Sequence, residues 1–265
     1  MSAMGDMTDD ERLELAKHGD RRAFDELVAP HLAKMKNLVR RMVGHPQDSE
    51  DITQDALVRA YTRLGTFRGE SSLSTWLCAI ATRVAIDHLA TRRAQGDLKV
   101  ALKEYVHETR DDEFWARVKT NAFDAREHIA FCFGCVSRSL PVEEQAALVL
   151  RDVLELSNDE AAHALDVTTS VLRHRLASAR TLMQERYAGL CRLVSKEGVC
   201  YQCEGLRNAF PDAQRGPAVP VIADVEPEIA MRKRLAVVRD ADLDGPSREL
   251  HAFLWRAVEA YLESR

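Results

Sequence analysis

The amino-acid sequence predicts an all-α fold. Aromatic residues make up 6% of the 265 residues and apolar residues 46%. Runs of β-branched residues are scarce, whereas Ala, Leu, Arg and Glu dominate and apolar positions recur at spacings of three and four. Helices are therefore expected to carry the fold, and strand-built folds are excluded.

Two helical domains and three further segments are expected along the chain. They are an N-terminal segment at 1–19, a first domain at 20–95, a flexible linker at 96–122, a second domain at 123–188 and a mostly helical C-terminal extension at 189–265. The linker is expected because its apolar periodicity is poor and its acidic and basic residues nearly cancel. The extension ends in an amphipathic helix near 247–262, whose apolar side must pack against this chain or a partner.

The first domain reads as three helices separated by two breaks. An amphipathic run covers 22–42, a break follows at 44–46, and a second helix starts near Asp48. One stripe of this helix is apolar, and its opposite face carries Asp51 and Asp55 close to the positive helix N-terminus. A loop is expected at 65–71, and helix resumes at Ser74.

The second domain reads as four helices, one ending before Pro141 and the others at 142–154, 158–165 and 169–187. Ser157 and Glu160 form a capping box that fixes the start of the third helix, and the turn at 166–168 has the length of a helix-turn-helix. Residues 141–166 contain seven acidic residues and one Arg, whereas 169–188 contain four Arg and one Glu. Adjacent surfaces of opposite charge suggest two different partners.

These two domains resemble regions 2 and 4 of an extracytoplasmic-function (group 4) sigma factor of bacterial RNA polymerase. The first resemblance lies in the stretch DSEDITQDALVRAY at 48–61, in FRGE at 67–70 and in TWL at 75–77; the second lies in SLP at 139–141, SNDEAA at 157–162 and VLRHRLASAR at 171–180. The resemblance implies a sigma factor that binds core RNA polymerase, recognises the -35 and -10 promoter elements and helps to open the DNA strands. It also admits an anti-sigma factor as a partner.

The resemblance implies site residues in region 2. The core-polymerase contact falls on Asp48, Asp51, Gln54 and Asp55. Binding of the -10 element, including capture of an unstacked base by the loop, falls on Arg68, Glu70, Ser71, Ser72, Arg83, His88 and Arg92. Trp76 is assigned to the core. Ala79 stands where the family usually has Arg, and Arg83 where it usually has Asn, which sets the -10 contacts of this chain apart.

In region 4 the helix at 169–187 is expected to enter the major groove of the -35 element. The implied contacts are Ser170, Arg173, His174, Arg175 and Arg180. Arg173 is the expected base contact, because an Arg fork binds guanine O6 and N7 together, while Arg175 and Arg180 are expected to neutralise phosphates. The acidic face of the preceding helices is expected to meet the polymerase flap; it comprises Glu143, Glu144, Asp152 and Glu155.

Two Cys-x2-Cys pairs stand outside this account. The pairs are Cys132 with Cys135 and Cys200 with Cys203, and Cys191 is a further candidate metal ligand. Their spacing lets two thiolates converge on one Zn²⁺, but the pairs lie far apart, and the first also fits the buried face of a helix. Zinc ligands, buried thiols and a redox-active dithiol all remain open.

Other functions are less well supported. The net charge of -5 argues against a polybasic DNA-binding coat. No signal peptide or spanning segment is visible, so we expect a cytoplasmic protein without membrane insertion. No P-loop, zinc-protease or nucleophile-elbow motif appears, so no enzyme is expected. The main alternative is a dimeric helix-turn-helix repressor that senses metal or thiol oxidation, followed by a dithiol oxidoreductase.

Overall fold

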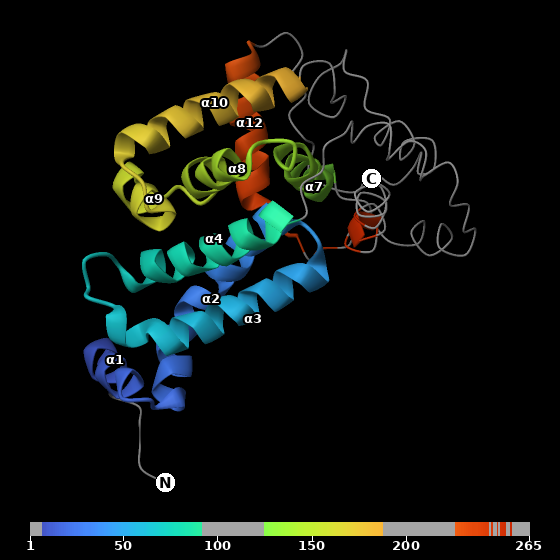
Figure 1. Ribbon diagram of the computed structural model, residues 1–265. Coiled ribbons are helices and arrows are strands. Elements are labelled where there is room, and N and C mark those ends of the chain that lie inside the picture. Colours follow the sequence, from blue (N-terminus) through green and yellow to red (C-terminus); the bar gives the residue numbers. More distant parts are fainter. Residues whose placement is uncertain are drawn as a thin grey trace.

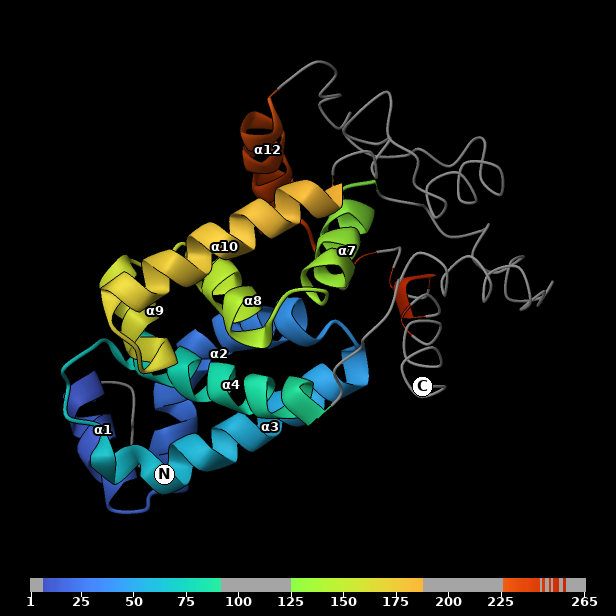
Figure 2. The ribbon, with the colours of Figure 1, turned by 45° about the horizontal axis from the view of Figure 1, so that its top comes forward.

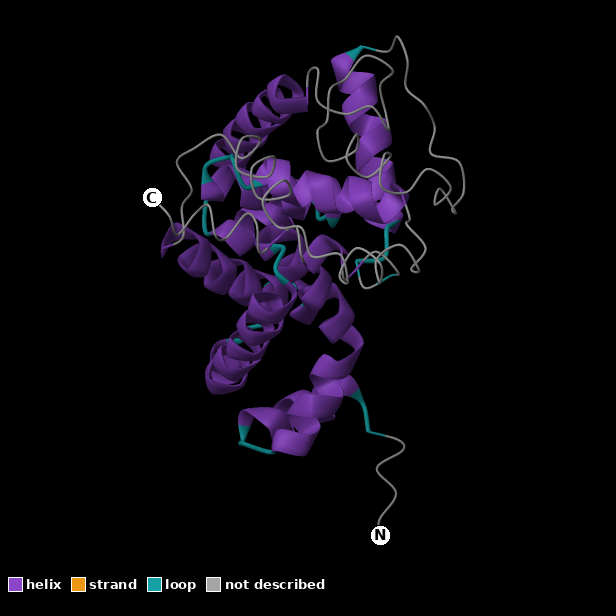
Figure 3. Cartoon of the chain, turned by 90° about the vertical axis from the view of Figure 1, so that its right-hand side faces the viewer, coloured by secondary structure: helices purple, strands orange, loops and turns teal. Residues whose placement is uncertain are grey.

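The computed structural model describes residues 7–91, 125–187, 226–243, 245, 248, 250–252 and 255. Within these ranges the chain forms helices and turns and no strand, as the cartoon in Figure 3 shows. The predicted all-α fold class is confirmed. Cys191, Cys200, Cys203, Arg92 and the expected linker at 96–122 lie outside the described residues.

The first block contains four α-helices and one short 3-10 turn. They are α1 (Asp9–Lys17), α2 (Arg21–Val43), α3 (Pro46–Arg63), η1 (Leu64–Thr66) and α4 (Leu73–Thr91). Gly44 ends α2 with φ 86°, a left-handed conformation that glycine adopts without strain. Helix α1 packs against α2, so the packed block begins upstream of the boundary expected at residue 20.

The second block contains α7 (Ala125–Ser137), α8 (Val142–Leu148), a π-helical turn η2 (Val149–Val153), α9 (Asn158–Leu165) and α10 (Thr169–Tyr187). The predicted bounds of the last two helices are confirmed, and so is the capping box of Ser157 and Glu160. Asp166 ends α9 in the left-handed conformation, with φ 55°. Local capping signals thus set the helix-turn-helix.

The helix expected at 142–154 is not one regular α-helix. After Leu148 the chain forms the π turn, in which the N–H of Leu154 donates to the carbonyl of Val149, five residues earlier, at 2.9 Å. Leu148, Val149 and Leu150 are buried throughout this stretch. The extra residue in the turn changes the direction of the side chains that follow it.

The two blocks pack directly on each other, which the sequence did not predict. Helix α4 lies against α8 and α9, and α2 lies against α7 and the π turn (Figures 1 and 2). Gln145 in α8 donates to the carbonyl of Met42 at 2.9 Å, and Arg138 donates to the carbonyl of Val43 at 3.3 Å. These carbonyls belong to the last turn of α2, where backbone carbonyls have no N–H donor within the helix. Side chains of the second block therefore complete the end of a helix in the first.

A further helix from the extension, α12 (Pro227–Asp240), packs against α7, the π turn and α10 (Figure 2). Sequence periodicity did not single it out. Of the final helix expected at 247–262, the structure describes few residues; Leu250 and Trp255 among them are buried.

Candidate nucleic-acid and protein-binding surfaces

One face of α3 is exposed and acidic. Asp51, Gln54, Asp55 and Val58 recur at helical spacing, and all four are exposed. Val58 is 63% exposed, which is unusual for a large apolar side chain in the described part of the chain. An exposed apolar side chain one turn beyond a carboxylate is suited to a protein partner that offers both basic and apolar groups.

Asp48, predicted to share this face, lies elsewhere. Its carboxylate is 3.4 Å from Nε2 of His88 and 3.7 Å from Nδ1 of His45, and its side chain is only 19% exposed. The structure thereby brings a predicted polymerase contact together with His88, a predicted -10 contact. Both side chains join the ends of α3 and α4, so neither is presented as freely as Asp51 and Asp55.

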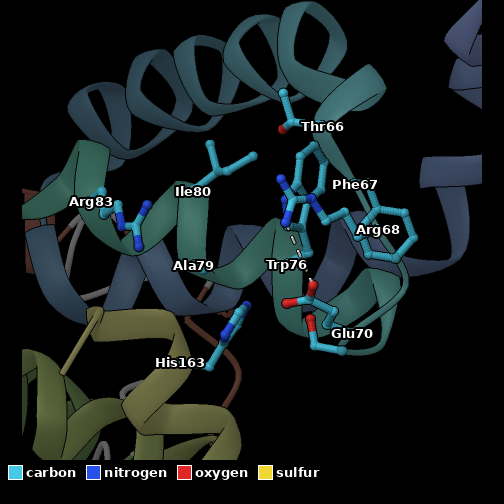
Figure 4. Close-up of a pocket in the computed structure, with 10 residues that line it drawn as sticks. Thr66, Phe67, Arg68, Glu70, Trp76, Ala79, Ile80, Arg83 and His163 are labelled. Atoms are coloured by element: carbon cyan, nitrogen blue, oxygen red, sulfur yellow. Dashed lines mark ion pairs between the residues drawn. The ribbon is translucent and has the colours of Figure 1, made fainter. Parts of the chain in front are cut away.

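The loop between η1 and α4 borders a pocket of about 300 Å³ (Figure 4). Its walls are Thr66, Phe67, Arg68, Glu70, Ser71, Trp76, Ala79, Ile80, Arg83 and His163. In its lining the Phe67 and Trp76 rings lie 5.4 Å apart at 55°, Arg68 pairs with Glu70 at 3.9 Å, and the loop turns at Gly69 with φ 74°. The aromatic walls would contact the face of a ligand, and the charged rim would meet its polar edge.

Trp76 is half-buried and packs against the hydrophobic core, as predicted, while one side of it also lines the pocket. Ser72 does not line this pocket. Its hydroxyl accepts a hydrogen bond from the N–H of Thr75 at 3.1 Å and lies 2.8 Å from the Thr75 hydroxyl. Ser72 therefore caps the first turn of α4, and its contact with DNA stays a prediction.

The second block supplies one wall of this pocket. His163 comes from α9, and Arg83 on the opposite side lies 3.8 Å from Asp166 at the end of α9. Sequence reasoning missed His163, because no local signal places a residue of α9 beside a loop nearly a hundred positions earlier. Both positions noted as departures from the family, Ala79 and Arg83, also line this pocket.

A partly buried polar contact joins the blocks beside the pocket. The hydroxyl of Thr75 donates to Oε1 of Glu160 at 3.0 Å. The backbone N–H of Ser157 is the largest of several groups that lower the pKa of Glu160; the Ser157 hydroxyl, Thr75 and Lys34 act in the same direction. Glu160 therefore combines the capping of α9 with the contact to α4.

The predicted -35 surface lies on α10. Ser170, Arg173 and His174 are exposed on one face near its start, and Arg175 is half-buried. Leu172 and Leu176 on the opposite face are buried, as predicted. Within the described residues no ion pair engages Arg173, so its guanidinium is available to a ligand.

Arg180, whose phosphate contact stays a prediction, forms an ion pair within the chain. Its guanidinium donates to both carboxylate oxygens of Asp152, at 2.8 and 2.6 Å, and Asp152 is nearly buried. The pair fixes α10 to the π turn. The acidic face predicted around Asp152 is likewise engaged internally, since Glu144 accepts from Ser178 at 2.9 Å and Glu155 lies 2.9 Å from Arg239 of α12.

Of the predicted metal ligands, the structure describes only the first pair. Cys132 is half-buried and Cys135 buried, both on α7. Among the described residues, no three His, Cys, Asp or Glu side chains gather as a metal site would require. Zinc stays a prediction that metal analysis of the full chain checks. In the same part of the chain no helix is both long and apolar enough to cross a bilayer.

Comparison with known proteins identifies the two blocks. The family model for sigma-70 region 2 matches residues 27–95, and that for sigma-70 region 4 matches residues 131–183. The RNA polymerase sigma-H factor of Pseudomonas aeruginosa is 32% identical over 190 residues, which cover 69% of this chain and 96% of that protein. The chain belongs to the sigma-70 family. It is a promoter-directing sigma factor of the extracytoplasmic-function type.

Other relatives of this sigma factor agree. The extracytoplasmic-function sigma-E factor of Escherichia coli K12 is 30% identical over 191 residues, covering 70% of this chain and 97% of that protein. Two solved structures also match. CnrH in complex with the cytosolic domain of CnrY is 22% identical with a TM-score of 0.45, and the match covers 67% of this chain and 95% of that one. RpoE of Bartonella quintana in complex with the anti-sigma factor NepR is 16% identical with a TM-score of 0.44, and the match covers 62% of this chain and 96% of that one. Family membership decides against the dimeric repressor and the dithiol oxidoreductase.

Proposed function

We propose that this sigma factor binds core RNA polymerase through the exposed face of α3, with Asp51, Gln54 and Asp55 as the polar contacts. The observation that supports this is the exposure of Val58 on the same face, one turn beyond Asp55. The carboxylates steer a basic partner and set its register, while burial of the Val side chain adds affinity. Asp48 contributes at the edge of this surface.

We propose that the pocket of region 2 holds one unstacked base of the -10 element. Extraction of a base costs a few kcal/mol, and stacking on an aromatic wall returns about 1–3 kcal/mol. Arg68, Glu70 and Ser71 border the pocket and supply polar contacts. Arg83 contacts the adjacent backbone once Asp166 has moved away from it. Arg92 and His88 stay predicted contacts of the same element, and Arg92 lies outside the described residues.

We propose that the first turns of α10 read the -35 element. Ser170, Arg173 and His174 share one exposed face, which supports contact with base edges, and Arg175 supports a phosphate contact. The chain acts as an initiation factor in the cytoplasm, with no reaction of its own. Its partners are core RNA polymerase, promoter DNA and, as the family admits, an anti-sigma factor.

The polymerase contact is tested by charge reversal. We expect the double variant Asp51→Arg/Asp55→Arg to lose binding to core RNA polymerase, measured by size-exclusion chromatography of the mixture, while its far-UV circular dichroism is unchanged. Asp25→Arg is the matched control, because Asp25 is an exposed carboxylate on α2. Retained binding by the double variant would assign the polymerase contact to another surface.

A further inference from the structure

The described residues of the C-terminal segment between 226 and 255, here called the clasp, contact both sigma regions. Met231, Leu235 and Val238 form a buried stripe along α12, which packs on α7 and the π turn of region 4. Arg234 lies over the ring of Tyr187, with its guanidinium carbon 3.7 Å from the ring centre. One side of the clasp is thus anchored to region 4.

Arg239 attaches the clasp to the surface that the sequence assigned to polymerase. Its Nε donates to the backbone carbonyl of Asp152 at 2.8 Å, and its guanidinium is 2.9 Å from the carboxylate of Glu155. Both acceptors belong to the acidic face expected to meet the polymerase flap. Because Arg239 is paired with Glu155, a basic group of the polymerase must compete with it for this carboxylate, which is 64% exposed.

The end of α12 is completed by region 2. The guanidinium of Arg41 donates to the carbonyls of Arg239 and Ala241, at 3.3 and 3.5 Å, and Arg40 donates to the carbonyl of Leu243 at 3.5 Å. Arg41 is only 4% exposed, and this burial lowers its pKa to about 10. A buried cation at the negative end of a helix is a specific contact, because water cannot replace the carbonyls that it binds.

Trp255 lies at the junction of the two regions. Its ring packs so closely on Gly44 that a Cβ atom at that position would lie 1.8 Å from it, and its edge meets the Phe131 ring at 5.6 Å. His251 stacks on the same Phe131 ring at 4.5 Å. Gly44 ends α2 in region 2, whereas Phe131 belongs to α7 in region 4, so this part of the clasp holds the two regions together.

The arrangement that the clasp holds is too short to read a promoter. The -10 and -35 elements are named by their positions, which lie about 25 base pairs apart. This separation corresponds to about 85 Å of duplex. A compact region with this number of residues has a diameter of about 30 Å, so two regions in contact span about 60 Å. His163 of α9 also stands in the wall of the -10 pocket. Regions 2 and 4 must therefore separate before both elements are bound.

We propose that the clasp is an intramolecular inhibitor: it holds regions 2 and 4 closed, competes with the polymerase for Glu155 of region 4, and must be released before initiation. This inference rests on the proposed function. It assigns to the extension a role that the matched regions 2 and 4 do not provide, since the clasp begins well beyond residue 183, where the region 4 match ends.

The test compares full-length variants of the clasp. Arg239→Ala removes the contacts to Asp152 and Glu155, and Arg239→Ala/Trp255→Ala also removes the packing on Gly44. Arg239 is one-third exposed, so the single variant is expected to fold. Arg232→Ala is the matched control, because Arg232 is an exposed arginine of the same helix. Thermal unfolding followed by circular dichroism checks that each variant is folded.

Two measurements decide the proposal. Energy transfer between fluorescent amino acids incorporated at the exposed positions Asp25 and Thr181 reports the separation of the regions. We expect the double variant to raise the open-to-closed ratio about tenfold, or about 1.4 kcal/mol, and the single variant to raise it less. Run-off transcription at limiting sigma factor is expected to rise in the same order, with Arg232→Ala equal to the wild type.

Unchanged energy transfer in a folded double variant would show that the clasp does not hold the regions together. Opening without any gain in transcription would show that the clasp is structural and not inhibitory. If no form, wild type included, binds core polymerase, the proposed function fails, while the energy-transfer result still judges the clasp by itself.

Discussion

The side-chain amide of Gln145 in region 4 donates a 2.9 Å hydrogen bond to the carbonyl of Met42 at the end of α2 in region 2. Gln145 is 2% exposed and also lies 3.1 Å from the hydroxyl of Ser137, so both ends of this contact are shielded from water. When a buried carbonyl loses its hydrogen-bond donor, the free-energy cost of removing that carbonyl from water is no longer offset. The contact between the two sigma regions therefore depends on this amide.

Gln145→Leu is expected to lower the free energy of unfolding by about 1–3 kcal/mol, because the carbonyl of Met42 loses its donor. Urea denaturation followed by tryptophan fluorescence measures the change. Gln54→Leu, at an exposed position on α3, serves as the control and is expected to change stability by less than about 0.5 kcal/mol. Equal stability of wild type and Gln145→Leu would mean that the inter-region contact contributes nothing to the fold.

Arg173 and Arg180 are expected to differ although both lie on α10. Arg173→Ala should reduce discrimination between the native and a base-substituted -35 element by about 1–3 kcal/mol, with unchanged stability. Arg180→Ala should instead lower stability by about 1–3 kcal/mol, because Asp152 loses both of its charge-assisted hydrogen bonds. Promoter competition assays and urea denaturation of each variant separate the two roles. Loss of stability in Arg173→Ala, or loss of discrimination in a folded Arg180→Ala, would reverse the assignment.

Arg68 at the rim of the -10 pocket is 82% exposed. Arg68→Ala is expected to weaken binding of the polymerase complex to a single-stranded -10 oligonucleotide. It is also expected to reduce the slope of the logarithm of the binding constant against the logarithm of the salt concentration by about one. Titrations at several salt concentrations measure both quantities. Arg63→Ala, an exposed arginine outside the pocket lining, is the control. The same salt slope in Arg68→Ala and wild type would remove Arg68 from the DNA contact.

Acid is expected to loosen the clasp. Burial lowers the pKa of His128 to about 4 and that of His251 well below 6.5, and for His251 the nearby charges of His128 and Arg40 act in the same direction. The unfolded chain therefore binds more protons than the folded one below pH 6.5, so the stabilisation is complete above that pH. As the pH falls from 6.5 towards 4, each of the two histidines lowers the free energy of unfolding by up to about 1.4 kcal/mol per pH unit.

His251→Phe keeps a ring on Phe131 and removes one titrating group, so its unfolding free energy should depend less on pH between 6.5 and 5 than that of the wild type. Chemical denaturation at both pH values measures the slope. A variant with the same slope as the wild type would show that His251 does not couple to folding in this range.

Local signals predicted the parts of the fold that depend on neighbours in sequence. Ser157, Glu160 and Asp166 set the ends of α9, and Gly44 and Pro46 separate α2 from α3, because caps and turns act within a few residues. The exposure of Asp51 and Asp55 on α3 followed from helical periodicity, whereas the contacts at the start of α10 were implied by the resemblance to region 4.

Features that depend on tertiary contacts were missed. The pairing of Arg180 with Asp152 was not foreseen, because an arginine on a recognition helix looks the same in sequence whether it binds phosphate or a carboxylate. The π turn that places Asp152 beside it has no local signature. Helix α12 and His163 were missed for the same reason, since their roles arise only when distant segments meet.

Run-off transcription with purified core RNA polymerase is the most direct test of the central claim that this chain directs initiation. On a library of duplex promoters, the account predicts start-site-specific transcripts only when the chain is added, and more of them from Arg239→Ala/Trp255→Ala than from the wild type. No specific transcript from any promoter, with either the wild type or the double variant, would contradict it.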